Sequence, residues 1–317
     1  MNRLNDTYDP DILPDLSGLD HCELCPRRCR ADRNAGKVGF CGAGRDIRIY
    51  SWSAHRGEEP PISGRHGSGT IFFSHCTLTC LYCQNYQMSQ LHEGSLYDVE
   101  GLAAIMADLA QRGCHNWNFV TPTPWLPQLR AALTVVRRQG VSLPLVYNTS
   151  GYERVAIVEK NRDLMDIVLT DLRYADPATA AEASTAPDLV ERARNFAVWA
   201  WRTFGPLKVD SSGVAQSGVI CRMLVLPGRA DEAIANLEWL AESIGTEIHI
   251  SLMSQYTPVY RAARLPGWNR RIGKAEYRSV TDRLKELGFK NGWVQDWIPG
   301  PDDDLLGCRM KSTRFKP

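Results

Sequence analysis

Three cysteines within eight residues constrain this chain more than any other feature. Cys76, Cys80 and Cys83 are separated by three and two residues, and they directly follow the apolar run 70–73. A structural zinc takes four ligands and a [4Fe-4S] cluster is usually held by four cysteines, so three thiolates leave one metal position open. An iron with free coordination sites can chelate a small molecule through an amine and a carboxylate. The spacing therefore predicts a [4Fe-4S] cluster with one open iron site.

Simpler interpretations of the same three thiols exist. They are compatible with buried thiols, with a disulfide and one thiol left over, or with a zinc site completed by His75. The loop follows a predicted strand, which is the context that an open cluster site at a strand end requires, and this position favours the cluster.

The Cys-x3-Cys-x2-Cys spacing, with Tyr82 just before the last cysteine, resembles the signature of the radical SAM superfamily. The following residues 84–86 (Gln-Asn-Tyr) resemble the branch of pyruvate formate-lyase activating enzyme, and the chain from Cys22 to Gln295 resembles its PflX-like branch rather than the activases themselves. The resemblance implies S-adenosylmethionine bound at the open iron. It also implies reductive cleavage to a 5′-deoxyadenosyl radical that abstracts hydrogen from a substrate, under anaerobic conditions.

A second group of cysteines precedes this loop. Its spacing is Cys-x2-Cys-x3-Cys-x11-Cys, and its members are Cys22, Cys25, Cys29 and Cys41. Four thiolates form a complete ligand set, and the glycines between and after the last two cysteines let the backbone fold back to close a site. Zinc and a second [4Fe-4S] cluster both accept four cysteines, so the sequence predicts a second metal of either kind. The alternative is a turn that is rich in thiols and binds no metal.

Composition limits the classes of partner. The chain has 317 residues, a net charge of +1 and 44% hydrophobic residues, which suits one large α/β domain with an appendage. Near-neutral charge gives no general argument for nucleic acid, and no apolar run approaches the roughly 18 residues that indicate a membrane span. The polar, acidic start of the chain does not look like a secretory signal, so we expect a cytoplasmic protein whose cysteines bind metals rather than form disulfides. Three of the ten cysteines lack partners in sequence and are expected to be buried thiols: Cys114, Cys221 and Cys308.

Strand and helix patterns alternate from residue 70 onward. Such alternation predicts βαβ units and a parallel sheet, and about six units are too few for a closed eight-stranded barrel. We therefore predict an α/β fold, an incomplete open (β/α)6 TIM-like barrel, which the resemblance also implies. The N-terminal leader and four-cysteine extension is predicted to cover 1–68, and the barrel with its C-terminal closing segment 69–317. The predicted strands are 70–73, 116–120, 145–147, 167–169, 219–226, 248–252 and 292–295, with an earlier one at 47–50; the predicted helices are 99–109, 126–136, 155–160, 188–200, 231–244 and 274–287.

Chemistry in parallel α/β architectures is found at the C-terminal ends of the strands. Residues near the predicted strand ends are therefore the candidate cofactor-binding residues. They are Asn116, Asn118, Asn148, Thr149, Ser150, Asp171, Arg173, Arg222, Leu224 and Gln255. A pair of glutamates at 58 and 59 has no chemical role that the sequence suggests, and a solvated turn is an equally good interpretation of it.

The family resemblance implies roles for several of these residues. In activating enzymes a Gly-Gly-Glu segment at the second strand end receives the amino group of S-adenosylmethionine; this chain instead has Asn116 and Asn118, followed by Thr-Pro-Thr-Pro at 121–124. An amide, a hydroxyl or a backbone carbonyl would have to replace the acid. The alternative is that both amides only form hydrogen bonds at the rim of the barrel.

The next two strand ends also match the family. Residues 148–151 resemble an Asp-Thr-Asn-Gly segment, and 171–173 resemble an Asp-Leu-Lys segment. The resemblance implies a monovalent cation site that includes Thr149 and Asp171. Arg173 would face the carboxylate of the cosubstrate, because a guanidinium is a planar bidentate donor. A surface ion pair is the alternative role for Arg173.

The remaining expected contacts concern the nucleoside. Arg222 would face the carboxylate, Leu224 the ribose or adenine, and Gln255 the ribose. Tyr82 would lie against the adenine, since an aromatic ring buries apolar area and orients a base. The histidine that activating enzymes often carry near the sixth strand end is absent here.

The chemistry requires an outside electron donor, expected to be a flavodoxin or ferredoxin. Two substrate classes follow from the resemblance: a glycyl radical protein that the chain activates, or a peptide or small molecule that a standalone enzyme modifies. A non-catalytic iron–sulfur or zinc module is a third hypothesis, and it would leave the motifs at the strand ends without a purpose.

Overall fold

The computed structural model describes residues 16–297 and 313–314. Within them one sheet runs in the order β11-β10-β9-β8-β6-β5-β4-β2-β1-β3, and β7 pairs with β8. The strands from β2 to β10 in this order are parallel to one another. The strands are β1 (Ile47–His55), β2 (Ser68–Phe73), β3 (Ser95–Tyr97), β4 (Trp117–Val120), β5 (Leu145–Thr149), β6 (Ile167–Asp171), β7 (Lys208–Val209), β8 (Ala215–Leu224), β9 (His249–Met253), β10 (Gly292–Val294) and β11 (Thr313–Arg314).

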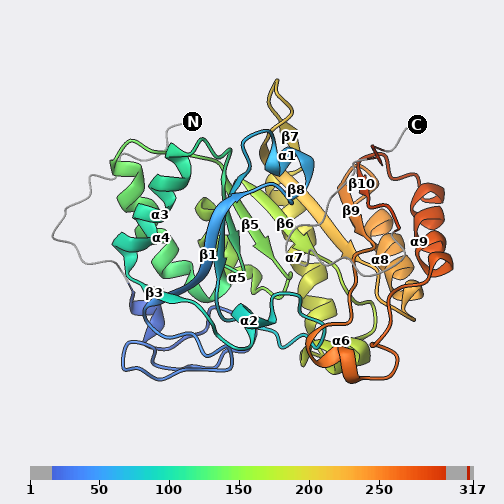
Figure 1. The fold of residues 1–317 in the computed structure, drawn as a ribbon, viewed down its shortest axis with the longest axis horizontal. Coiled ribbons are helices and arrows are strands. Elements are labelled where there is room, and N and C mark those ends of the chain that lie inside the picture. The colour runs from blue at the N-terminus through green and yellow to red at the C-terminus, as the bar shows by residue number, and fades with distance from the viewer. Residues whose placement is uncertain (1–15, 298–312, 315–317) are drawn as a thin grey trace.

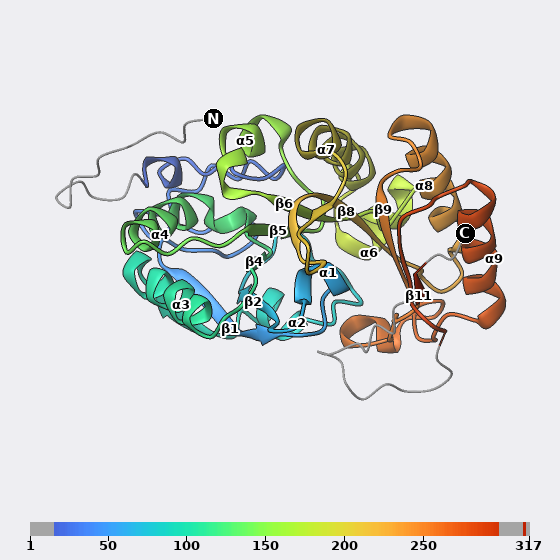
Figure 2. The same cartoon turned by 90° about the horizontal axis from the view of Figure 1, so that it is seen from above.

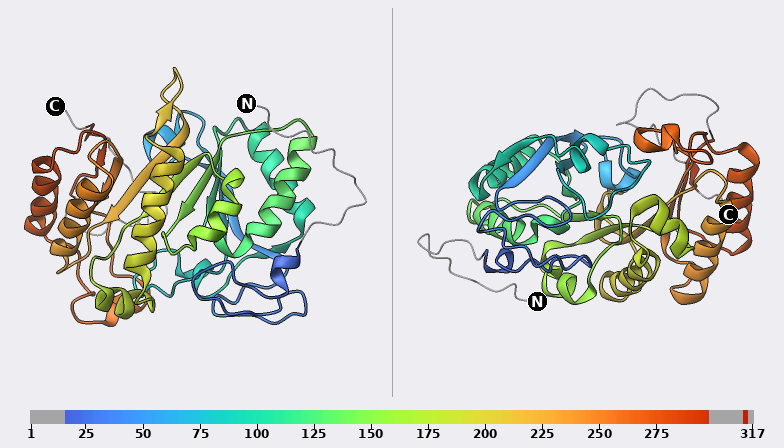
Figure 3. Two further views of the ribbon diagram at one scale, coloured as in Figure 1. Left: turned by 180° about the vertical axis from the view of Figure 1, so that it is seen from behind. Right: turned by 90° about the horizontal axis from the view of Figure 1, so that it is seen from below.

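The helices form an arc outside the curved sheet (Figures 1 and 2). The view from behind in Figure 3 shows them lying in front of the strands. The short helices α1 and α2 lie on the opposite, concave side (Figure 2). The helices are α1 (Pro60–Ser63), α2 (Tyr86–Ser89), α3 (Val99–Gln111), α4 (Leu126–Arg138), α5 (Val155–Lys160), α6 (Pro177–Ser184), α7 (Leu189–Phe204), α8 (Ala230–Ser243) and α9 (Lys274–Glu286).

Local sequence explains where the helices begin and end. The carboxylate of Asp98 accepts the backbone N–H of Gly101 at 2.8 Å and so caps α3. Leu102, Met106 and Leu109 of that helix recur on one face and are fully buried, each contributing about 1.5–3 kcal/mol relative to exposure. Gly288 follows α9 with a φ of 77°, a left-handed conformation that ends the helix and that glycine adopts without steric strain.

The predicted fold class is confirmed, because the sheet is mixed, mostly parallel and not closed. The parallel strands lie where the hydrophobic pattern predicts them, and the predicted closing strand corresponds to β10, which pairs with β9. The sequence analysis missed the full length of β1, which pairs antiparallel with β2, and the three short strands β3, β7 and β11. Strands this short contain too few residues to show an alternating hydrophobic pattern, so the sequence did not predict them.

The segment before the barrel lies beside it. Residues 17–44 run beneath β3 and α4 in Figure 1, drawn in dark blue, while β1 extends the sheet beyond β2. Among the helices of the described residues, none has both the length and the hydropathy needed to cross a bilayer.

Candidate active site

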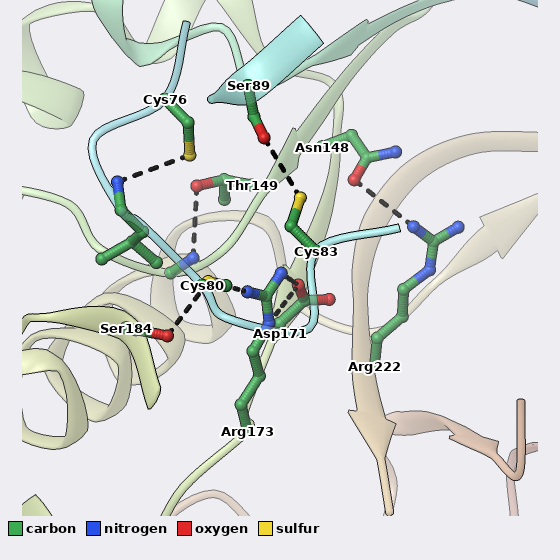
Figure 4. Close-up of polar contacts among 12 residues, drawn as sticks. Cys76, Cys80, Cys83, Ser89, Asn148, Thr149, Asp171, Arg173, Ser184 and Arg222 are labelled. Carbon is green, nitrogen blue, oxygen red and sulfur yellow. Dashed lines mark hydrogen bonds and ion pairs between the residues drawn. The ribbon is translucent and has the colours of Figure 1, made fainter. Parts of the chain in front are cut away.

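A cavity of about 250 Å³ lies at the C-terminal ends of the parallel strands. It is bounded by the three-cysteine loop and by residues that end β5, β6 and β8 (Figure 4). The predicted residues that line it are Cys76, Cys80, Tyr82, Cys83, Asn148, Thr149, Ser150, Asp171, Arg173, Arg222, Leu224 and Gln255. The structure therefore brings together most of the residues that the strand-end rule selected.

Each of the three thiols has a hydrogen-bond donor beside it. The backbone N–H of Leu78 donates to Cys76 Sγ at 3.4 Å, and the hydroxyl of Ser89 lies 3.1 Å from Cys83 Sγ. The Cys80 sulfur lies 3.0 Å from the hydroxyl of Ser184 (Figure 4). Such donors stabilise thiolate ligands and tune an iron–sulfur cluster, so the loop fits the group that its spacing predicts.

Arg173 lies between the thiol of Cys80 and the carboxylate of Asp171. Its Nη1 donates to Cys80 Sγ at 3.2 Å, and its Nε and Nη2 donate to Asp171 Oδ2 at 3.1 and 2.5 Å. Burial alone would lower the pKa of Arg173, but Asp171 and Cys80 outweigh it and raise that pKa. Burial also raises the pKa of the Cys83 thiol to about 11, and the neighbouring Cys80 adds to the effect. The guanidinium is therefore a permanent positive charge at the cluster loop.

The ring of Tyr82 is buried beside the cavity. It stacks on Trp268 with 5.6 Å between ring centroids, and it packs at a tilt against Tyr256. Its hydroxyl lies 2.6 Å from that of Tyr174, which lies 2.7 Å from Ser184 Oγ. The aromatic group thus fixes the position of the cysteine loop against α6.

Two of the predicted residues do not reach the cavity. Asn116 precedes β4 at its N-terminal end, where its amide oxygen accepts from Ser68 Oγ at 2.6 Å and its nitrogen donates to Ile62 O. Asn118 is also fully buried, and its Nδ2 donates to Glu58 Oε1 at 2.9 Å. Asn116 precedes the N-terminal end of β4 and Asn118 lies within the strand, whereas the cavity is at the C-terminal end, so neither amide reaches it.

The sequence analysis missed a buried ion group on the concave side of the sheet. Arg222 donates through Nε and Nη2 to the two carboxylate oxygens of Glu59, at 2.6 and 2.7 Å, and its Nη2 also donates to Glu58. Burial alone would raise the pKa of Glu59, but Arg222 outweighs it and lowers that pKa. The two glutamates are therefore neither solvated nor in a turn at the surface. Their only sequence signal was the pair of charges directly before two prolines.

Glu153, also missed, lies fully buried beneath Thr149. Its Oε1 accepts from the hydroxyls of Thr123 and Thr149, both at 2.6 Å, and of Tyr147 at 3.2 Å. Its Oε2 has no hydrogen-bond partner among the described residues. Burial raises the pKa of Glu153 from 4.5 to about 7, although the three hydroxyls oppose this shift.

Replacing Glu153 by glutamine is expected to change how stability depends on pH. Because the folded pKa lies above the unfolded value, the wild-type carboxyl stabilises the fold below pH 4.5 and loses that contribution as pH rises through about 7. A shift from 4.5 to about 7 corresponds to roughly 3 kcal/mol. The free energy of unfolding of the wild type, minus that of Glu153→Gln, should fall by this amount between pH 4.5 and 8 in urea titrations. A difference that does not vary with pH would contradict the assignment.

The four-cysteine segment contacts the cluster loop on both sides of Cys76. The Nε of Arg27 donates to Thr77 O at 3.1 Å, and His75 Nδ1 lies 3.0 Å from Cys41 O. Among the described residues, no three or more His, Cys, Asp or Glu side chains are gathered around a single ion position.

Two observations bear on whether this segment fits a metal. Arg33 is fully buried, and the partners of its guanidinium are the carbonyls of Gly44 and Pro124 and the sulfur of Cys22 at 3.9 Å. No carboxylate pairs with Arg33 among residues 16–297, so thiolates would balance its charge. A Cβ at Gly39 would lie 2.2 Å from Cys29 Sγ, so glycine leaves the space that this thiol occupies. Both observations fit a four-thiolate site.

The expected buried thiols can also be located. Cys114 and Cys221 are buried, as predicted, while Cys308 lies outside the described residues.

Comparison with known proteins gives one family match and one curated relative. Residues 63–182 match the family model described as a 4Fe-4S single cluster domain, and this range contains the three-cysteine loop. The uncharacterized protein MJ0674 of Methanocaldococcus jannaschii is 26% identical over 279 residues, which are 85% of this chain and 75% of that protein.

Two solved structures are similar at low identity. Native anSMEcpe with bound AdoMet has a TM-score of 0.45 and 10% identity, over 67% of this chain and 57% of that one. TYW1 with a lysine-pyruvate adduct bound has a TM-score of 0.44 and 12% identity, over 72% and 76% of the two chains. The chain thus spans little more than half the length of the first of these structures. The Cys-x3-Cys-x2-Cys loop lies within the range that matches the 4Fe-4S single cluster domain, so this match supports the [4Fe-4S] cluster that the cysteine spacing predicts.

Proposed function

We propose that the chain is an enzyme that binds a [4Fe-4S] cluster through Cys76, Cys80 and Cys83 and cleaves S-adenosylmethionine at it. The observation that carries this proposal is that all three thiols line one cavity and each has a hydrogen-bond donor beside it. When bound, the cluster supplies the electron that cleaves the sulfonium and so starts hydrogen abstraction from the substrate.

The side chains of the cavity would bind and orient the cosubstrate. Arg173 is held by Asp171 and remains charged, which suits the carboxylate of S-adenosylmethionine. The residues proposed to contact its other groups are Tyr82, Asn148, Ser150, Leu224 and Gln255. Gln255 is oriented by Gln295, whose Nε2 donates to its Oε1 at 3.0 Å.

Two contacts that the structure shows modify the expected cosubstrate contacts. Arg222 forms ion pairs with two carboxylates, Glu58 and Glu59, whereas Arg173 pairs with Asp171 alone, so Arg222 is less suited than Arg173 to bind a further carboxylate. A monovalent cation at Thr149 and Asp171 stays a proposal, and the hydroxyl of Thr149 already donates to Glu153.

The second metal is proposed for the segment that contains Cys22, Cys25, Cys29 and Cys41, within the extension 1–68 that precedes the proposed catalytic unit 69–317. The unpaired buried charge of Arg33 and the close approach of Gly39 to Cys29 support four thiolates there. Zinc and a [4Fe-4S] cluster both remain candidates for this site.

The outer face of the same segment suits an acidic electron donor such as a flavodoxin or ferredoxin. Arg28, Cys29 and Lys37 are exposed there, and so is Phe40, with 44% of its surface accessible. Positive charge around an apolar contact favours fast association with an acidic one-electron carrier. The contacts of Arg27 with Thr77 and of Cys41 with His75 support this proposal, because they join the segment to the three-cysteine loop.

For the substrate we propose either a glycyl radical protein or a peptide or small molecule. The resemblance of residues 84–86 to activating enzymes supports the first, whereas the resemblance of the whole chain to a branch other than the activases, and the four-cysteine segment packed on the three-cysteine loop, support a standalone enzyme of the second kind.

Anaerobic reconstitution with iron and sulfide tests the proposed activity directly. Dithionite and S-adenosylmethionine should then yield 5′-deoxyadenosine and methionine, measured by liquid chromatography. The proposal fails if a protein whose cluster is demonstrably reduced, by its electron paramagnetic resonance signal, forms no 5′-deoxyadenosine.

A further inference from the structure

The charged side chains around the cavity are unequally paired. The described residues that line it include two carboxylates, Glu58 and Asp171, and two guanidinium groups, Arg173 and Arg222. Asp171 is paired with Arg173. Arg222 is shared between Glu58 and Glu59, and Glu59 lies behind the lining and is fully buried. Two cations therefore face three carboxylates, and the group carries one excess negative charge.

Glu58 is the residue that carries this excess. Glu59 takes the two-point interaction with Arg222 and also accepts from the hydroxyl of Ser251. Glu58 shares only Nη2 of the same guanidinium, and its other oxygen accepts from a neutral amide, Nδ2 of Asn118. A buried carboxylate without a full counter-charge is unfavourable unless a cation completes it.

We propose that Glu58 receives a positively charged group, an ammonium or a guanidinium, of a molecule bound in the cavity. This inference rests on the proposed function and specifies the ligand chemistry of the same site. The amide oxygen of Asn118 is buried beside Glu58 and has no partner among the described residues, so it offers a second acceptor at this position. Phe72, Leu224 and Met253 line the cavity as well and suit an aliphatic stem.

Two molecules could supply the cation: the substrate, or S-adenosylmethionine through its amino group. The register of the sheet favours the substrate. Glu58 contacts Asn118, which pairs with Thr70, whereas Val120, at the cavity, pairs with Phe72 two residues further along both strands. Two residues of strand correspond to about 7 Å of depth, so Glu58 lies below the level of the cluster loop.

The test compares Glu58→Gln with the wild type, both reconstituted with iron and held with excess S-adenosylmethionine. Glutamine keeps the volume and an acceptor for Asn118 while it removes the charge. The probes are L-lysine and L-arginine, with L-norleucine and L-citrulline as counterparts that lack the side-chain charge, and binding is measured by saturation-transfer NMR titration. The wild type should bind at least one cationic probe about 10-fold more tightly than its uncharged counterpart, and Glu58→Gln should lose this preference.

A second arm measures the dissociation constant of S-adenosylmethionine by anaerobic equilibrium dialysis. A loss of about 10-fold in Glu58→Gln, without any probe preference in the wild type, would assign the cation to the cosubstrate instead. If neither the probe preference nor the cosubstrate affinity differs between the two proteins, the inference is overturned. Glu247→Gln, at a glutamate paired with Lys290 on the exposed surface, is the matched control.

The proposed function and this inference can fail separately. Formation of 5′-deoxyadenosine by the wild type decides the first, whatever the probes do. Circular dichroism of Glu58→Gln confirms that it folds, as expected because Glu59 keeps its two-point pairing with Arg222.

Discussion

Replacing Cys80 by alanine is expected to reduce 5′-deoxyadenosine formation to the level of a blank without protein. The thiol is buried in the cavity and receives two donors, Nη1 of Arg173 and the hydroxyl of Ser184. No other cysteine of the described chain lines the cavity apart from Cys76 and Cys83, so two thiolates would be left to hold a cluster. Iron and sulfide per chain, and the electron paramagnetic resonance signal of the reduced protein, would report the loss directly.

The same variant separates the two cysteine groups. Cys22, Cys25, Cys29 and Cys41 are unaltered in it, so metal that remains after Cys80→Ala belongs to the four-cysteine segment. Counting iron and zinc in that protein also distinguishes a zinc site from a second cluster. Cys114→Ala is the matched control, because Cys114 is equally buried but does not line the cavity. A Cys80→Ala protein that still cleaves S-adenosylmethionine at the wild-type rate would contradict the cluster assignment.

The strand-end rule located most of the site because it follows from topology. Parallel strands point their C-terminal ends to one edge, so Asn148, Asp171 and Arg222 meet there whatever the loops do. The rule holds only for the C-terminal end of each strand, however. Asn116 was selected at the start of the predicted strand 116–120, and it lies before the N-terminal end of β4, at the opposite edge of the sheet.

The residues that the sequence did not indicate lie outside this pattern. Glu58 and Glu59 come from the segment before α1, which has no strand periodicity, and their partner Arg222 is more than 160 residues away. Glu153 follows β5 by four residues, and only the fold shows that three hydroxyls surround it. Long-range pairing of charges is decided by tertiary packing, and one sequence carries no local signal for it.

The pairing of Arg222 with Glu59 leads to the largest expected effect on stability. Arg222→Met should lower the free energy of unfolding by about 3–5 kcal/mol, because it leaves the fully buried carboxylate of Glu59 without its counter-charge. The loss would be measured by urea denaturation of the protein at pH 7.5. Arg283→Met is the control, since that arginine forms only exposed pairs with Glu238 and Glu286, and it should change stability by less than about 1 kcal/mol.

A double variant shows whether the cost comes from the unpaired charge or from lost packing. In Arg222→Met with Glu59→Gln the carboxylate is gone, so most of the lost stability should return even though the guanidinium is still missing. If packing of the arginine stem were responsible, the double variant would be as unstable as Arg222→Met alone. Glu58 is unaltered in both proteins and also loses Arg222 as a partner, so the cost that the double variant retains sets an upper limit on the combined effect of the unpaired Glu58 and the lost packing of the arginine.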